Sequence, residues 1–113
     1  MASKTATPDL DIDLEEDLEE RTSFYKQYIL IVHNDNDHTF DYVVETFMKT
    51  FRYTVEQCAK LAYRIHTEQL AVVFSGLFEH VELKRDQIVS CGPDLYNPLK
   101  PVTYPLLTEI REI

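Results

Sequence analysis

The pattern of apolar and polar residues predicts alternating strands and helices. Residues 24–33 are apolar nearly throughout, which indicates a first strand in the centre of a sheet. Thr39 is a suitable N-cap for a helix that follows, and Asp41 suits the positive end of that helix. The apolar residues of this helix fall on one helical face: Phe40, Val43, Val44, Phe47 and Phe51. The helix is expected to end near Phe51, where this pattern stops.

The remaining elements follow from capping and breaking signals. A capping-box pattern at residues 54–57 opens a second helix, and His66 lies at the end of its apolar face. Residues 70–74 predict a second strand. Residues 77–90 predict a third helix, which the Cys91-Gly92-Pro93 run ends. The last extended segment is expected at 99–106, confined to a sheet edge by its two prolines.

This order of elements, β-α-α-β-α-β, predicts a small α+β domain over residues 23–113. Its economical form is a three-stranded antiparallel sheet covered by helices. Residues 1–22 hold eight of the twenty acidic residues and few residues that can pack, so we expect a disordered acidic N-terminal arm.

Composition narrows the possible functions. The net charge of −9 leaves no dense basic face for nucleic acid or an anionic membrane surface. The chain contains no apolar stretch long enough for a bilayer span and no signal-peptide core, so a cytoplasmic protein is expected. Cys58 and Cys91 do not form a CxxC pair, and both are expected to be reduced.

A run of hydrogen-bonding side chains from His33 to Thr39 follows the first strand. This placement suits a ligand with one polar and one apolar end, although a loop whose Asn and Asp side chains bind local amides is an alternative. An EF-hand is excluded, because the sixth position counted from Asp35 is not glycine and Thr46 occupies the place of the bidentate glutamate. No zinc motif is present among the candidate ligands His33, Asp35, Asp37, His38 and His66, so neither a metal nor a cofactor is expected.

Catalysis has little support in the sequence. The chain contains no GxSxG motif. Cys58 and His66 share a helical face but lie about 12 Å apart at 1.5 Å per residue, too far for a nucleophile and its base. An enzyme is therefore the least favoured interpretation.

Four segments in order resemble the ClpS family, the adaptors that deliver substrates with destabilising N-terminal residues (N-degrons) to the ClpA or ClpC unfoldase of a Clp protease. The segments are Tyr25–Asn36, Phe40–Val44, Ala59–His66 and Leu70–Val73. Pro98-Leu99 resembles the Pro-Leu that opens the last strand of the family. The resemblance covers residues 24–107 and implies a non-catalytic, monomeric adaptor that binds the free first residue of a substrate.

The resemblance also implies site residues. The substrate α-amine is expected at Asn34, Asp35, Asn36 and His66. The side-chain pocket for Leu, Phe, Tyr or Trp is expected from His33, His38, Phe40, Val43, Ala62, Ile65 and Leu99. The surface that docks on the unfoldase N-terminal domain is expected at Glu79, Glu82 and Lys84.

Several positions depart from the family pattern. Asn36 replaces an aspartate, His38 a small hydroxyl residue, and Phe40 and Ala62 replace methionines, while Gln69 stands in place of the usual glycine. These changes affect the expected side-chain preference more than the adaptor role. The alternative is a ClpS-fold module that modulates the unfoldase without binding N-degrons.

Overall fold

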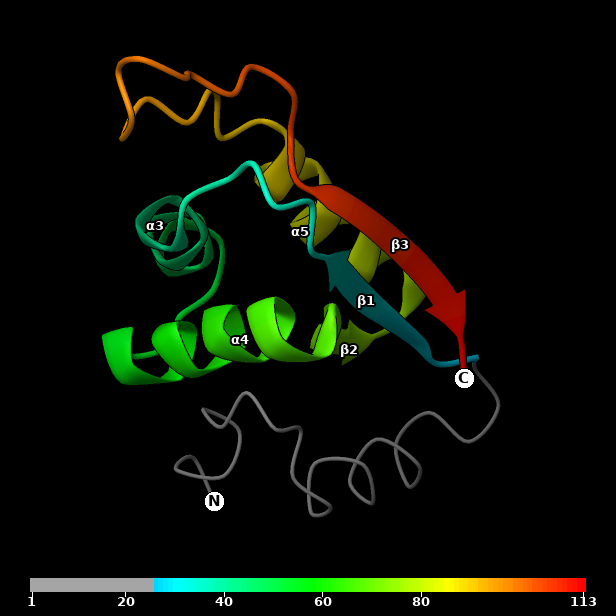
Figure 1. Cartoon of the computed structure of the whole chain (residues 1–113). Helices are drawn as coiled ribbons and strands as arrows, with labels where there is room; N and C mark the ends of the chain where they lie inside the picture. Colours follow the sequence, from blue (N-terminus) through cyan, green and yellow to red (C-terminus); the bar gives the residue numbers. More distant parts are fainter. Residues whose placement is uncertain (1–25) are drawn as a thin grey trace.

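The computed structural model describes residues 26–113, so the predicted acidic arm at 1–22 lies outside the described residues. These described residues form three strands and three helices in the order β-α-α-β-α-β (Figure 1). Their bounds are β1 Tyr28–His33, α3 Phe40–Thr50, α4 Val55–Glu68, β2 Leu70–Gly76, α5 Phe78–Val89 and β3 Leu107–Glu112. No helix in this part of the chain is long and apolar enough to cross a membrane.

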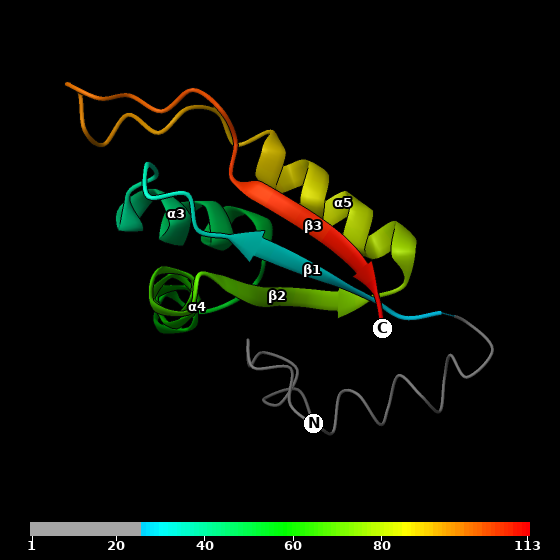
Figure 2. The ribbon, with the colours of Figure 1, turned by 45° about the vertical axis from the view of Figure 1, so that its right-hand side comes forward.

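The strands form one antiparallel sheet in the order β2-β1-β3, which confirms the predicted α+β fold class and the central place of the first strand (Figure 2). Tyr28 pairs with Gly76 on one side and with Glu112 on the other. β1 is therefore hydrogen-bonded along both edges, as its continuous apolar run predicts.

The last strand is not where the sequence predicts it. β3 occupies residues 107–112, whereas residues 90–106 form a long connection from α5, called here the 90–106 loop. Within it, Asp94 and Val102 form an isolated antiparallel bridge, with N···O distances of 2.8 and 3.0 Å in the two directions. Pro101 and Pro105 lack the N–H that a strand needs, so the chain pairs with β1 only after them.

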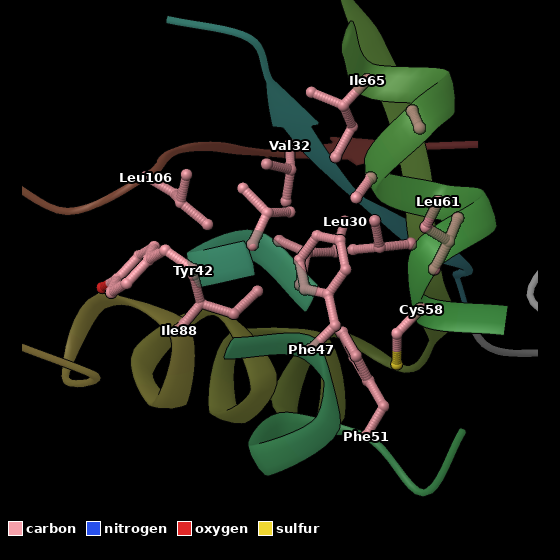
Figure 3. Packing of buried hydrophobic residues seen from close by; sticks show 14 of the residues in the cluster. Leu30, Val32, Tyr42, Phe47, Phe51, Cys58, Leu61, Ile65, Ile88 and Leu106 are labelled. Carbon is pink, nitrogen blue, oxygen red and sulfur yellow. The ribbon is translucent and has the colours of Figure 1, made fainter. Parts of the chain in front are cut away.

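One hydrophobic core joins the sheet to the helices (Figure 3). Leu30 and Val32 project from the same face of β1 and are fully buried together with Phe47 of α3. Leu61 and Ile65 of α4 and Ile88 of α5 belong to the same cluster. Burial of these side chains fixes α3 and α4 against the end of β1, where the polar run begins.

Candidate functional site

Asn34 is the first residue beyond β1, and its position is set by Gln69, the residue between α4 and β2. Its backbone N–H donates to the Gln69 carbonyl at 2.8 Å. Its Nδ2 lies 2.9 Å from Asn36 Oδ1 and 3.3 Å from Gln69 Oε1. The side-chain amide of Asn34 is therefore held by one contact within its own loop and by one contact from Gln69.

Two of these residues have left-handed backbone conformations. Asn36 has φ 67° in the segment from Asn34 to Thr39, called here the 34–39 loop. Gln69 has φ 74° as the C-cap of α4, a position at which glycine is usual because it has no Cβ. The side chain of Gln69 offsets this cost, since its Nε2 donates to the His66 carbonyl at 3.2 Å and its Oε1 accepts from Asn34.

Asp35 holds the 34–39 loop together through its side chain. Its Oδ1 accepts the backbone N–H groups of Asp37 and His38, each at 2.9 Å, and its Oδ2 lies 2.5 Å from Nδ1 of His38. Burial by itself raises the pKa of Asp35, but these N–H groups and the His38 ring together bring the pKa below its ordinary value. Asp35 is therefore an ionised internal acceptor.

His38 lies at the centre of the loop, with its side chain only 1% exposed. Nδ1 contacts the Asp35 carboxylate, and Nε2 lies 2.9 Å from the carbonyl oxygen of Tyr104. Each ring nitrogen therefore faces an oxygen acceptor, which fixes the orientation of the ring. The ring also stacks on Tyr42 at 5.1 Å and meets Tyr104 edge-on at 5.2 Å.

A cavity of about 330 Å³ opens between the 34–39 loop, α3 and α4, and is called here the first cavity. Its polar side is formed by Asn34, Asn36, His38 and His66, and its apolar side by Phe40, Val43, Ala62 and Ile65. His66 is exposed, whereas Ala62 and Ile65 are buried on the adjoining turns of α4. The cavity thus presents one polar and one apolar end to a single ligand.

Three residues that the resemblance implies do not line this cavity. His33 lies on the face of β1 opposite Leu30 and Val32, because side chains alternate along a strand, and its Nε2 contacts Glu109 at 2.9 Å. Asp35 is occupied within the 34–39 loop. Leu99 is 90% exposed in the 90–106 loop.

The position of Leu99 reflects a duplicated Pro-Leu signal in the sequence. The pair immediately before β3 is Pro105-Leu106, and Leu106 is buried in the hydrophobic core. Pro98-Leu99 belongs to the intervening loop instead. The Pro-Leu that opens the last strand is therefore found later in the chain than the resemblance suggests.

The residues expected at the unfoldase-docking surface all lie on α5, but in different environments. Glu79 is exposed, and Glu82 is 3.6 Å from Arg85. Lys84 Nζ donates to the Thr50 carbonyl at 3.0 Å and lies over the Phe51 ring at 5.9 Å. Lys84 therefore also stabilises the packing of α5 on the C-terminus of α3.

Three residues that position the site were not predicted from the sequence. Gln69 braces Asn34, Tyr104 binds His38, and buried Asp94 accepts the backbone N–H of Thr39 at 2.7 Å. The sequence signal that points to Tyr104 and Asp94 is the length of the 90–106 loop, because long connections in small domains are often functional. Within residues 26–113, no group of three or more His, Cys, Asp or Glu side chains is arranged to hold a metal ion.

Comparison with known proteins identifies relatives of this chain. Residues 24–102 match the family model described as ATP-dependent Clp protease adaptor protein ClpS. Two curated relatives share the name ATP-dependent Clp protease adapter protein ClpS. The Thermosynechococcus vestitus protein is 33% identical over 78 residues, 68% of this chain and 82% of the relative. The Lawsonia intracellularis protein is 36% identical over 55 residues, 49% of this chain and half the length of the relative.

A solved structure shares the fold. The structure of Agrobacterium tumefaciens ClpS2 bound to L-phenylalaninamide superposes with a TM-score of 0.61 over 78% of this chain and 98% of that chain. The sequence identity is 19%, so this likeness concerns the fold alone.

Proposed function

Since this chain belongs to the ClpS family of Clp protease adaptor proteins, we propose that it binds the free N-terminal residue of substrate proteins and delivers them to a Clp unfoldase. The family is one of adaptors and not of catalysts. The observation that carries the proposal is the first cavity, which joins amide and imidazole groups to an apolar wall. A bulky first residue has the same two ends, an ammonium and an apolar side chain.

The amine end is proposed to bind side-chain oxygens of Asn34 and Asn36 and the ring of His66. No carboxylate is among the described side chains that line the first cavity, since Asp35 is directed into its own loop. The ammonium is therefore held by two amide oxygens and an imidazole ring, close to the acidic side chains of the 34–39 loop. Each hydrogen bond to a charged group contributes about 1.5–3 kcal/mol, so two of them suffice for selection of a free amine.

The apolar end is proposed to fill the space between Phe40, Val43, Ala62 and Ile65. Burying a Leu or Phe side chain contributes about 1.5–3 kcal/mol. Ala62 leaves more room on the α4 side of the cavity than a methionine, while the half-exposed ring of Phe40 borders the other side. Micromolar affinity for Leu-, Phe-, Tyr- or Trp-first chains follows once the entropy of association is subtracted.

Delivery requires a second contact, which we place on α5. An unfoldase of the ClpA or ClpC type is the proposed partner, with Glu79 and Glu82 as its contacts and Lys84 contributing through the shape of the surface. Holding a substrate beside the unfoldase raises the local substrate concentration without any chemical step. The alternative function, modulation of the unfoldase without N-degron binding, uses this surface alone.

A peptide series separates the two functions. Amidated peptides that differ only in residue one, with Phe, Leu or Gly there, are titrated into the wild type, His66→Ala and the control His80→Ala, which changes an exposed histidine on α5. We expect the wild type to bind the Phe- and Leu-first peptides and not the Gly-first peptide. The affinity for the Phe- and Leu-first peptides should fall at least about tenfold in His66→Ala and stay unchanged in His80→Ala. Equal affinities for all three peptides favour the alternative.

A further inference from the structure

The 90–106 loop is anchored to the 34–39 loop and to α3 at several points. The Tyr104 hydroxyl donates to the Asp37 carboxylate, and the Tyr104 carbonyl accepts from His38. Asp94, which is 1% exposed, accepts both the N–H and the hydroxyl of Thr39. The 90–106 loop is therefore a fixed wall beside the polar end of the first cavity, where it projects past α3 (Figure 2).

A second cavity of about 480 Å³ lies between these two loops. The 34–39 loop contributes Asn36, Asp37 and Thr39, and the 90–106 loop contributes a segment from Lys100 to Tyr104. Asn36 lines both cavities, so the second continues from the polar end of the first. A ligand whose amine is at Asn36 has the second cavity directly within reach.

We propose that the second cavity binds residues two and three of the substrate chain whose first residue occupies the first cavity. This inference rests on the proposed function. An extended chain advances about 3.3 Å per residue, so residues two and three lie within one short step of the captured amine. The occupant is thus the continuing peptide backbone together with one polar side chain.

The lining suits that occupant. Asn97 and Thr103 supply donors and acceptors for peptide N–H and carbonyl groups, and Val102 and the Tyr104 ring supply apolar contact. Lys100 brings a positive charge opposite the negative charge of Asp37. Reversing the charge of Lys100 is therefore expected to change which charged side chain is preferred near residue three.

The test compares three probes: phenylalaninamide, the amidated peptide Phe-Ala-Asp-Ala and the amidated peptide Phe-Ala-Lys-Ala. Each is titrated at low salt into the wild type, Lys100→Glu and the control Lys26→Glu, which makes the same charge change before β1, at the end away from the 34–39 loop. A third variant, Thr103→Trp, fills the second cavity from an exposed position.

The inference predicts that wild type binds a tetrapeptide about two- to fivefold more tightly than phenylalaninamide. Lys100→Glu shifts the affinity ratio of the two tetrapeptides toward the lysine peptide by about two- to fivefold, whereas Lys26→Glu does not. In Thr103→Trp, the tetrapeptides are expected to bind no more tightly than phenylalaninamide. All variants retain wild-type affinity for phenylalaninamide.

Two results overturn the inference. One is equal affinity of wild type for phenylalaninamide and both tetrapeptides, and the other is an unchanged tetrapeptide ratio in Lys100→Glu. Either result leaves the proposed function standing if phenylalaninamide binds. Failure of all three probes to bind the wild type contradicts the proposed function itself and the inference with it.

Discussion

The imidazole of His38 binds the backbone of Tyr104, 66 residues later in the chain, through Nε2 at 2.9 Å from the carbonyl oxygen. The same ring meets the Tyr104 ring edge-on, and its other nitrogen binds Asp35. A single buried side chain therefore connects the loop after β1 to the loop before β3. The geometry of both cavities depends on this connection.

Replacing His38 with Phe is expected to destabilise the protein. The variant keeps ring stacking on Tyr42 but leaves an Asp35 oxygen and the Tyr104 carbonyl without their donors. The expected loss is about 2–4 kcal/mol in the free energy of unfolding. Urea unfolding measures it, with His80→Phe at an exposed position as the control, expected within about 0.5 kcal/mol of wild type. A His38 variant as stable as its control contradicts the connection.

Asp35 predicts a specific dependence of stability on pH. Its pKa in the folded state is lowered from 3.8, so the folded state binds fewer protons than the unfolded state. The stabilisation is present above the unfolded pKa, about 4, and is lost as pH falls through the lowered folded value. Asp35→Asn is expected to be less stable at pH 7 and to lose less stability below about pH 4, in unfolding midpoints measured against pH. Asp86→Asn, at an exposed position, should keep the wild-type slope.

Gln69→Gly is expected to separate stability from binding. Glycine relieves the cost of φ 74°, which is about 1 kcal/mol for a residue with a Cβ, although two exposed hydrogen bonds are lost. Unfolding free energy should rise by about 0.5 kcal/mol or stay constant, while affinity for a Phe-first peptide falls because Asn34 loses its brace. A Gln69→Gly variant with reduced stability and unchanged peptide affinity would contradict this prediction.

Ala62→Met should change the preference among first residues. The added atoms enter the first cavity from α4, and such changes alter packing by about 1–3 kcal/mol. Large side chains such as Phe and Trp are expected to weaken more than Leu, as measured by titration with matched peptides. Ala59→Met serves as the control, since Ala59 does not line the cavity. Identical affinities in the two variants exclude residue 62 from the pocket.

Local patterns predict most of the fold. Continuous apolarity places β1 in the centre, and helical periodicity with good caps places α3 and α4, because these signals are carried by neighbouring residues. The strand after α5 is predicted too early. Pro98-Leu99 and Pro105-Leu106 carry the same local signal, and only pairing with β1 distinguishes them.

The site is less predictable, since its geometry depends on distant contacts. The resemblance to the ClpS family implies Val43, Ala62 and Ile65 as pocket residues, and all three line the first cavity. His33 does not line the cavity, because its position in β1 directs its side chain toward Glu109. The Asp35 carboxylate is bound by the His38 ring, a contact that the sequence did not predict. Tyr104 and Asp94 reach the 34–39 loop across more than fifty residues, and no local pattern specifies such contacts.

In the proposed function, the first cavity captures a free amine together with an apolar side chain. The most direct test of this capture is titration of wild type with one Phe-first peptide in two forms, with a free and with an acetylated N-terminus. We expect the free peptide to bind and the acetylated peptide to bind at least about tenfold more weakly, since acetylation removes the charge that Asn34, Asn36 and His66 bind. Superimposable titration curves for the two peptides would contradict the proposed function.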